Sequence, residues 1–423
     1  MSFATSLKAA LRSPLLPFWL VLALLPVGRA SELGTFLCLL GCIMLFVREP
    51  RALSGHAGAR MLLWLFAAYF AAALVSALDS VAMARSWETV VGIIRYIPLG
   101  LYACFAIRRR SRLHAMYVAS GVVVALWALD AWVQIFTGWS LGGHAAPERI
   151  SGIFGAGNLK LGPVLASLSP FVLWLFREQW KRRGLILAML LMLGPILLAG
   201  SRAAWLTFAL VALAFAWREA RTPLRLLGWC AGGLLALALA AGLAWKTSPR
   251  FHQRMQRTMQ VFSDTEQGVN TATSGRLDIW SVALRMYLGH PINGVGVRAF
   301  RYAYPAYASS NDHFVTSEEA CGKNQGACHA HQLVLEVASD TGTIGLLAWL
   351  AATVLAWRTW RRRDPQARAL AYPSTVALAV TVFPLNTHLA FYSAWWGLFF
   401  WWLLALWCAA LFVVEDEALE LDP

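Results

Sequence analysis

The chain has 423 residues, of which 59% are hydrophobic and only 14% are charged. Soluble proteins carry about 25% charged residues, so this composition excludes a soluble globular protein and indicates an integral membrane protein. The formal net charge of +14 would suit nucleic-acid binding if the basic residues formed one patch, so their positions decide how the charge is interpreted.

The basic residues are grouped in short gaps between apolar runs, at every second gap along the chain. The groups are Lys8/Arg12, Arg48/Arg51/Arg60, Arg108/Arg109/Arg110/Arg112, Arg177/Lys181/Arg182/Arg183, Arg218/Arg221/Arg225 and Arg358/Arg361/Arg362/Arg363/Arg368. They hold 21 of the 36 Lys and Arg residues, which is the pattern of cytoplasmic loops under the positive-inside rule. The charge therefore indicates membrane topology, and we expect no nucleic-acid partner.

Twelve apolar runs are candidates for membrane-spanning helices, since about 20 apolar residues cross the hydrocarbon core. In chain order they are residues 14–29, 32–48, 61–79, 86–107, 113–136, 159–177, 184–200, 203–218, 223–246, 342–358, 369–390 and 394–414. The first run is interpreted as an uncleaved anchor because further runs follow at once. We predict an all-α, polytopic membrane protein with both termini in the cytoplasm.

One polar segment, residues 246–341, interrupts the apolar pattern and is predicted to form a large, mostly helical loop on the outer side. Residues 1–245 then carry nine of the predicted spans. Residues 342–423 carry the other three and an acidic cytoplasmic tail. The loop is the only region large enough to form a subdomain outside the membrane.

Two helices are predicted inside this loop. Apolar residues at helical spacing predict a helix that begins with Ser274 as its N-cap. Turn-forming residues from Gly289 to Gly296 end it. A second helix is predicted from near His331 to Thr341-Gly342, and because it leads back into the membrane it would fix the position of His331.

Two of the seven cysteines, Cys321 and Cys328, fall in the outer loop, and the others lie in apolar runs. An oxidising compartment would favour a disulfide between them. A metal site that adds His329 and His331 has suitable ligand types but lacks the usual short cysteine spacing, and free thiols are a further alternative. The compartment argument favours the disulfide, and no metal is expected.

Four basic residues on the predicted outer side are candidates for holding a phosphate or pyrophosphate. Arg276 falls in the first turn of a predicted helix, where free backbone N–H groups also attract anions. Arg202 lies at the tip of a tight hairpin and opposes the positive-inside pattern. Arg149 and Lys160 flank a glycine-containing loop and could join the same site. The ordinary alternatives are a surface ion pair for Arg276 and headgroup contact for Arg202.

His331 and His329 are candidate general bases, because imidazole near neutral pH can accept a proton from a sugar hydroxyl. Most loop histidines are not catalytic, and His144, His290 and His313 also lie on the predicted outer side. The sequence contains no Walker, Rossmann, HExxH or GxSxG motif. No cofactor is therefore expected.

These motifs resemble those of the bacterial O-antigen ligase and polymerase superfamily of integral-membrane glycosyltransferases. The matching stretches are Ser274-Gly275-Arg276-Leu277-Asp278-Ile279-Trp280, Gly289-His290-Pro291 through Gly294-Val295-Gly296, His329-Ala330-His331-Gln332 through Gly342-Thr343-Ile344-Gly345, and Ser201-Arg202. The arrangement of about twelve spans around one long outer loop is also similar. One departure is Gln332, where the family commonly has Asn.

The resemblance implies an O-antigen ligase that moves a polysaccharide from undecaprenyl pyrophosphate to lipid A–core, on the periplasmic face of the inner membrane and without a metal. By motif, His331 would be the general base, and Arg276 and Arg202 would hold the pyrophosphate. The anomeric configuration would be inverted. His329, Arg149 and Lys160 are less specific candidates. The partners would be the lipid-linked glycan, lipid A–core and membrane lipids.

Three other functions remain open. An O-antigen polymerase or a protein O-oligosaccharyltransferase would use the same donor with a different acceptor, so the sequence separates them poorly. The single long outer loop favours a ligase or a protein transferase over a polymerase, by resemblance. A transporter would need ionisable residues near mid-membrane and matched repeats, and Arg95 is the main such residue in a sequence without an evident repeat.

Overall fold

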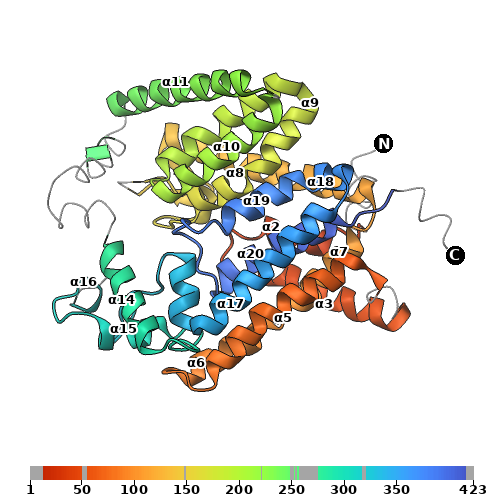
Figure 1. Ribbon diagram of the computed structural model, residues 1–423. Helices are drawn as coiled ribbons and strands as arrows, with labels where there is room; N and C mark the ends of the chain where they lie inside the picture. Colours follow the sequence, from red (N-terminus) through yellow and green to blue (C-terminus); the bar gives the residue numbers. More distant parts are fainter. Residues whose placement is uncertain are drawn as a thin grey trace. The chain divides into compact units, whose positions relative to one another are not determined.

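The computed structural model describes residues 13–49, 55–146, 149–220, 222–247, 252, 255–256, 275–316 and 321–415. Regular structure in these residues is almost entirely helical (Figure 1). The exception is a short antiparallel ladder of β1 (Trp139–Ser140) and β2 (Gly143–His144). Ser274, predicted as an N-cap, and the acidic tail beyond Glu415 lie outside the described residues.

Contacts divide the chain into two units. Unit 1 consists of Met1–Met116, Arg276–Thr375 and Val382–Pro423, and unit 2 of Tyr117–Gly275 and Val376–Thr381. Two helices, α8 (Arg110–Thr137) and α19 (Tyr372–Thr381), contribute residues to both.

Unit 1 is organised around its last helix, which is apolar and buried. The helices of this unit are α2 (Leu16–Ala23), α3 (Ser31–Arg48), α5 (Ala57–Ala77), α6 (Met83–Ile93), α7 (Tyr96–Ala106), α14 (Arg276–Gly289), α15 (Phe300–Tyr307), α16 (His313–Thr316), α17 (Leu333–Arg362), α18 (Pro365–Leu370) and α20 (Ala394–Leu411). Trp402 of α20 is fully buried, and its indole N–H donates to the carbonyl of Phe18 at 3.0 Å. This helix contacts α2, α5 and α7.

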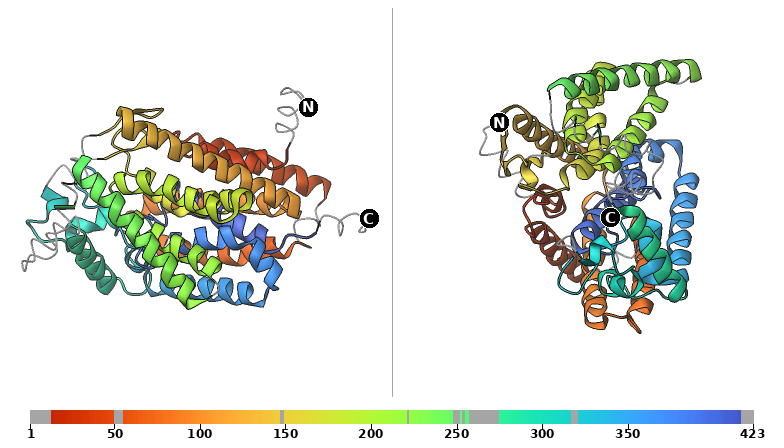
Figure 2. Two further views of the ribbon diagram at one scale, coloured as in Figure 1. Left: turned by 90° about the horizontal axis from the view of Figure 1, so that it is seen from above. Right: turned by 90° about the vertical axis from the view of Figure 1, so that its left-hand side faces the viewer.

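Unit 2 contains most of α8 together with η1 (Gly152–Phe154), α9 (Leu161–Leu198), α10 (Arg202–Ala220) and α11 (Pro223–Thr247). In this unit α10 contacts both α9 and α11, and the three helices are drawn in yellow-green to green in Figure 2. The helix α9 is interrupted at Trp180 and Lys181, whose φ and ψ angles are not helical. Gly184 is required after this break, because a Cβ there would lie 2.0 Å from the carbonyl oxygen of Phe176.

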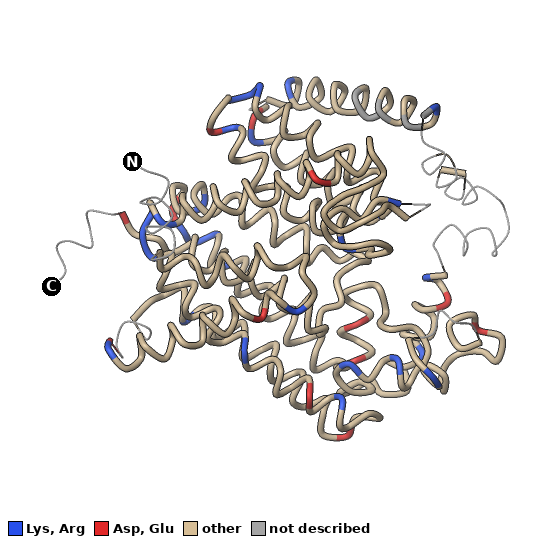
Figure 3. The backbone as a smooth tube through the Cα atoms, turned by 180° about the vertical axis from the view of Figure 1, so that it is seen from behind, with Lys and Arg blue, Asp and Glu red and all other residues tan. Residues whose placement is uncertain are grey.

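Among the described residues, seven helical segments are long and apolar enough to cross a membrane. They are Ser31–Arg48, Ala57–Ala77, Met83–Ala106, Arg110–Thr137, Arg202–Ala220, Leu333–Arg362 and Ala394–Leu411. Charged residues are sparse along the helices and more frequent in the turns (Figure 3). The all-α, polytopic membrane architecture predicted from the sequence is confirmed at this level.

Several predicted boundaries were wrong. The predicted run 369–390 is helical only to Thr381, because Phe383 precedes Pro384 and a proline disfavours helical geometry at the residue before it. The predicted run 14–29 contains a helix of only eight residues, α2. The boundary predicted at Gly342, by contrast, is confirmed. The backbone of Gly342 is not helical and divides α17 into a helix that begins at Leu333 and a helix that ends at Arg362.

The part of unit 1 that contains α14 and α15 has its own small apolar core. It is formed by α14, α15 and the chain just before α17, and its members are Ile279, Val282, Ala283, Met286, Val295, Ala299, Phe300, Ala303, Tyr304, Ala327 and Ala330. Ala330 is fully buried in it and lies between the two histidines of the HAHQ motif. This core therefore holds the backbone that presents His329 and His331.

Candidate active site

His331 occupies the turn directly before α17. Its φ angle of 52° lies in the left-handed region, which a residue with a Cβ rarely adopts. Gln332 caps the helix, since its Oε1 accepts the backbone N–H of Leu335 at 2.5 Å. Its Nε2 donates to the carbonyl of Pro384 at 2.8 Å. Gln332 thus uses both ends of its amide to hold the turn that carries His331.

The imidazole of His331 is oriented by the non-helical segment that follows α19. One ring nitrogen donates to the backbone carbonyl of Thr387, so the other ring nitrogen is an acceptor when the ring is neutral. Burial and the charge of Arg276 lower the pKa of His331 to about 4, while the Thr387 bond acts in the opposite direction. At neutral pH His331 is uncharged and has a lone pair available for a proton.

His329 packs against His331, with ring centroids 3.8 Å apart. Burial lowers the pKa of His329 well below its usual range. The pKa is lowered further by His331, which would repel a second proton when protonated, and by the positive charge of Arg298. Its Nε2 is buried and has no hydrogen-bond partner among the described residues. The two imidazoles therefore form a neutral pair in a positively charged environment.

Arg276 is the first residue of α14 and follows Gly275, which has a φ angle of 69°. Its charge lowers the pKa of three imidazoles, those of His331, His329 and His388, in each case after the larger effect of burial. Its positive charge therefore acts on all three rings. A cation at this helix end, beside neutral imidazoles, is suited to bind an anion.

His388 is a residue of this cluster that the sequence did not reveal, because it fell inside the predicted run 369–390. It is buried, and its backbone N–H donates to Asn386 Oδ1 at 2.9 Å. The ring Nε2 lies 3.1 Å from Asn386 Nδ2. Burial and Arg276 lower the pKa of His388 to about 3. The polar run Asn386-Thr387-His388 after Pro384 was the available signal that the helix ends early.

Two buried acids of α17 were also missed. Glu336 and Asp340 are 0% and 1% exposed, and their spacing of four residues places them on one helix face. Glu336 Oε1 accepts the backbone N–H of Tyr392 at 3.4 Å, and Asp340 Oδ2 accepts that of Arg298 at 3.0 Å. These carboxylates thus tie α17 to the segments on both sides of the histidine cluster. The available signal for these two acids was their spacing of four residues in an otherwise apolar helix.

Cys321 and Cys328 are joined in a disulfide with Cα atoms 5.0 Å apart, so their sulfurs are not available as thiolate ligands. The closed loop is attached to α15, because the N–H of Gly326 donates to the carbonyl of Arg301 at 3.0 Å. In the part of the chain that the structure describes, no group of three or more His, Cys, Asp or Glu side chains could hold a metal. The disulfide loop leads directly into His329.

The other predicted basic residues belong to unit 2. Arg202 is the first residue of α10, and Lys160 directly precedes α9. These helix ends are neighbours, because a Cβ on Gly162 would lie 3.4 Å from that of Ala204. Burial lowers the pKa of Lys160. Arg149 lies in the loop before η1. The next residue, Ile150, donates its backbone N–H to the carbonyl of Leu198 at the end of α9 at 3.3 Å. Unit 2 thus gathers these three cations at one end.

Residues 187–350 match the family model described as O-antigen ligase. The matched segment includes α10, α11 and α14 to α16, and it extends through part of α17. It contains His329, His331, Arg276 and Arg202, whereas His388 lies outside it. A search of curated proteins finds no match. The family match confirms the resemblance that the motifs indicate.

Proposed function

We propose that this chain, whose residues 187–350 match the family model described as O-antigen ligase, transfers a polysaccharide from undecaprenyl pyrophosphate to a sugar hydroxyl of lipid A–core. The reaction would occur on the periplasmic face of the inner membrane. The observation that carries this proposal is the environment of His331, which is neutral, is fixed by Thr387 and is subject to the positive charge of Arg276. A base beside an anion-binding cation is the pair that a glycosyl transfer of this kind needs.

In the proposed reaction, the acceptor hydroxyl oxygen attacks the anomeric carbon that carries the pyrophosphate. The bond between that carbon and the pyrophosphate oxygen breaks, and its electron pair leaves with the pyrophosphate. The hydroxyl proton passes to the free ring nitrogen of His331, whose other nitrogen is held by Thr387. Attack opposite the leaving group inverts the anomeric configuration. The residues supply orientation, proton transfer and charge stabilisation.

Arg276 would bind the pyrophosphate and stabilise its charge as it leaves. A bound pyrophosphate also offsets the positive charge that lowers the pKa of His331, so donor binding makes His331 a stronger base. Arg202, with Lys160 and Arg149, is proposed as a second set of cations for the donor headgroup, on the strength of the family motif and of their common position in unit 2.

The test is transfer in vitro by the purified protein, with undecaprenyl-pyrophosphate-linked glycan as donor, lipid A–core as acceptor, and EDTA present. We expect product with wild type and none with His331→Ala. His313→Ala is the matched control, because His313 is an exposed histidine of the same outer region, and it should retain activity. Wild-type product that requires an added divalent metal would contradict the metal-independent mechanism.

Arg276→Lys tests the anion-binding role. A guanidinium binds two phosphate oxygens at once, whereas an ammonium offers a point charge, so we expect a clear loss of activity in this variant. Full activity would contradict bidentate binding. The acceptor decides among the related functions. Extension of the lipid-linked glycan without transfer to lipid A–core would indicate a polymerase, and transfer to a protein Ser or Thr would indicate a protein O-oligosaccharyltransferase.

A further inference from the structure

Residues 293–298 connect two parts of unit 1 through backbone hydrogen bonds. On one side, the N–H of Gly296 donates to the carbonyl of Asp340 in α17 at 3.1 Å. On the other side, the hydroxyl of Ser86 in α6 donates to the carbonyl of Val297 at 2.8 Å. The segment therefore lies between α6 and α17, and it ends at Arg298.

Two arginines at the end of this segment have unused hydrogen-bonding capacity. The backbone N–H of Arg298 donates to Asp340 Oδ2, and the carbonyl of Arg301 accepts the N–H of Gly326 from the disulfide loop. The Nε atoms of both side chains are buried and have no partner among the described residues. Both guanidinium charges act on the buried carboxyl group of Asp340, and that of Arg298 also acts on Glu336, but these contacts leave the two Nε atoms without a partner. A buried donor without a partner is costly, which favours a ligand at this point.

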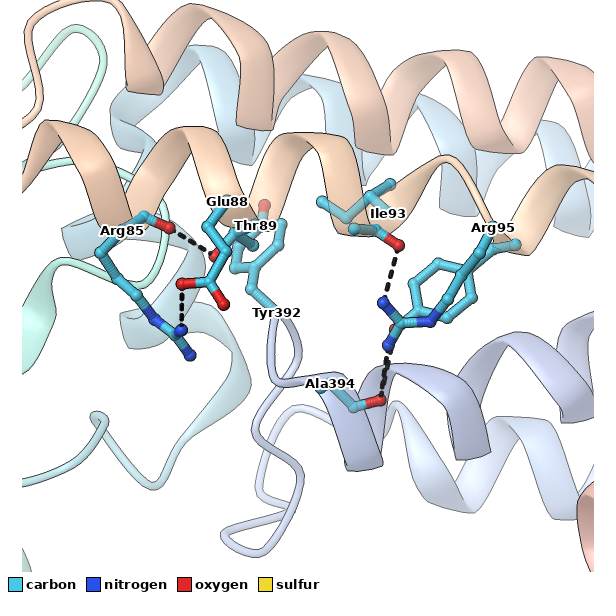
Figure 4. A pocket seen from close by; sticks show the side chains of 9 residues that line it. Arg85, Glu88, Thr89, Ile93, Arg95, Tyr392 and Ala394 are labelled. Atoms are coloured by element: carbon cyan, nitrogen blue, oxygen red, sulfur yellow. Dashed lines mark hydrogen bonds and ion pairs between the residues drawn. The ribbon is translucent and has the colours of Figure 1, made fainter. Parts of the chain in front are cut away.

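A third arginine, Arg85, lies next to Ser86 and lines a cavity of about 80 Å³ with Thr89 and Tyr392 (Figure 4). It pairs with Glu88 at 2.6 Å. The Glu88 side chain is 69% exposed, and an exposed ion pair of this kind contributes little stability. Arg85 can therefore exchange this partner for a bound anion at small cost.

At the opposite end of the cavity lies another arginine, Arg95, which several contacts hold in place. Arg95 lies 3.3 Å from Glu32 and donates to the carbonyl of Gly92 at 2.8 Å. Its guanidinium also lies 4.9 Å from the ring centre of Tyr96. These contacts hold the junction of α6 and α7, so we assign Arg95 a structural role.

The three arginines act on one another and on the histidine pair. Burial lowers the pKa of Arg301, and the charges of Arg298 and Arg85 lower it further. Arg298 and Arg301 also contribute to the low pKa of His329, after burial and His331. Asp340 acts on Arg301 in the opposite direction, but burial and the two arginine charges outweigh it. Like charges repel, so an added anion would stabilise the cluster. The cluster is therefore suited to bind an anion beside His329.

We propose that Arg85, Arg298 and Arg301 form a subsite that binds a phosphate group of the acceptor lipid and holds the acceptor next to the histidine pair. Guanidinium groups match phosphate oxygens through paired N–H donors. The proposal rests on the proposed function, since it concerns the acceptor of that reaction. It assigns acceptor recognition to residues other than Arg276.

Binding to the full-length protein in nanodiscs tests this subsite without requiring turnover. The probes are lipid A–core and the same lipid after enzymatic removal of its phosphates. Arg298→Gln, Arg301→Gln and the surface variant Arg85→Gln should each weaken binding of the phosphorylated lipid about tenfold or more, because each removes a charge-assisted contact. Binding of the dephosphorylated lipid should be weak in wild type and unchanged in the variants. Arg358→Gln, at the other end of α17, is the control and should bind like wild type.

Three results would overturn the proposal. The first is equal binding of the phosphorylated lipid by wild type and by Arg85→Gln, a variant chosen because it leaves the buried segment intact. The second is an equal loss of affinity for the undecaprenyl-pyrophosphate donor, which would assign the arginines to the donor. The third is that inorganic phosphate binds the protein as tightly as the phosphorylated lipid does and displaces it, which would show that the site has no preference for the lipid. Failure of the proposed function is a separate result, namely the absence of transfer by wild type to any acceptor.

Discussion

Substitution of Gln332 separates two functions of one side chain. In Gln332→Ala, both the cap to Leu335 and the bond to Pro384 are lost. Loss of a helix cap costs about 1 kcal/mol, and loss of a second hydrogen bond costs about 1 kcal/mol more. Gln332→Asn shortens the side chain by one methylene, so it keeps a favourable cap but cannot reach Pro384. We therefore expect about 2 kcal/mol of destabilisation for Ala and about 1 kcal/mol for Asn.

The activity of the two variants should fall together although their stabilities differ. The contact with Pro384 positions the segment that contains Thr387, and Thr387 orients the His331 ring. Displacement of a catalytic group by about 1 Å can reduce rate on the order of a hundredfold. We expect a reduction in kcat of tenfold or more for both variants, measured by transfer at saturating donor and acceptor, with thermal melting in detergent measured in parallel. Wild-type kcat in Gln332→Asn would refute the coupling between Pro384 and His331.

Three further predictions follow from the same region. The pKa of His331 is lowered to about 4 in the folded state, so folding favours its neutral form. The stability that this group contributes is fully present above the ordinary histidine pKa of about 6.5. It is lost as the pH falls from there toward 4. In a profile of kcat/KM against pH, measured with a slow substrate, the loss of activity at acid pH should accordingly lie well below pH 6.5 in wild type. It should move to higher pH in Arg276→Gln, because removal of the guanidinium charge raises the pKa of His331. An unchanged profile would contradict the influence of Arg276. Replacing both Cys321 and Cys328 by Ser should lower stability by about 2 kcal/mol, because the closed loop is short, while Cys230→Ser should melt like wild type; equal melting of all three proteins would show that the disulfide adds no stability. Gly296→Ala should destabilise the protein by about 2 kcal/mol or more and impair acceptor binding. The reason is that φ is 111° at this position and the new Cβ would lie 2.0 Å from Ser80 Oγ. A variant as stable as wild type would mean that this contact relaxes easily.

The membrane helices could be predicted because hydrophobic length is a local property of the sequence. The runs that became α3, α5 and α10 needed no knowledge of their neighbours. The turn at Ser201 before α10 was equally local, since a polar pair separates two apolar runs. By contrast, the end of α19 depended on Pro384 and on a polar run that average hydrophobicity over 369–390 concealed.

The arrangement around His331 could not be predicted because it depends on contacts distant in sequence. Asp340 binds the backbone of Arg298, which is 42 residues away, and Glu336 binds that of Tyr392, which is 56 residues away. Neither spacing forms a motif, because the partner is a backbone N–H that every residue except proline carries. The sequence could name His331 and Arg276 as candidates, but it contained no signal that Thr387 would orient one of them.

The low pKa of His331 has a mechanistic consequence within the proposed reaction. A base held neutral by burial and by Arg276 resists protonation in the empty site, so it is available over a wide pH range but is weak. Pyrophosphate bound to Arg276 would compensate the guanidinium charge and raise the basicity of His331 only while the donor is present. Activation of the acceptor hydroxyl would thus depend on donor binding. The same compensation would fade as the pyrophosphate departs, which would favour return of the proton to solvent and restore the neutral base for the next cycle.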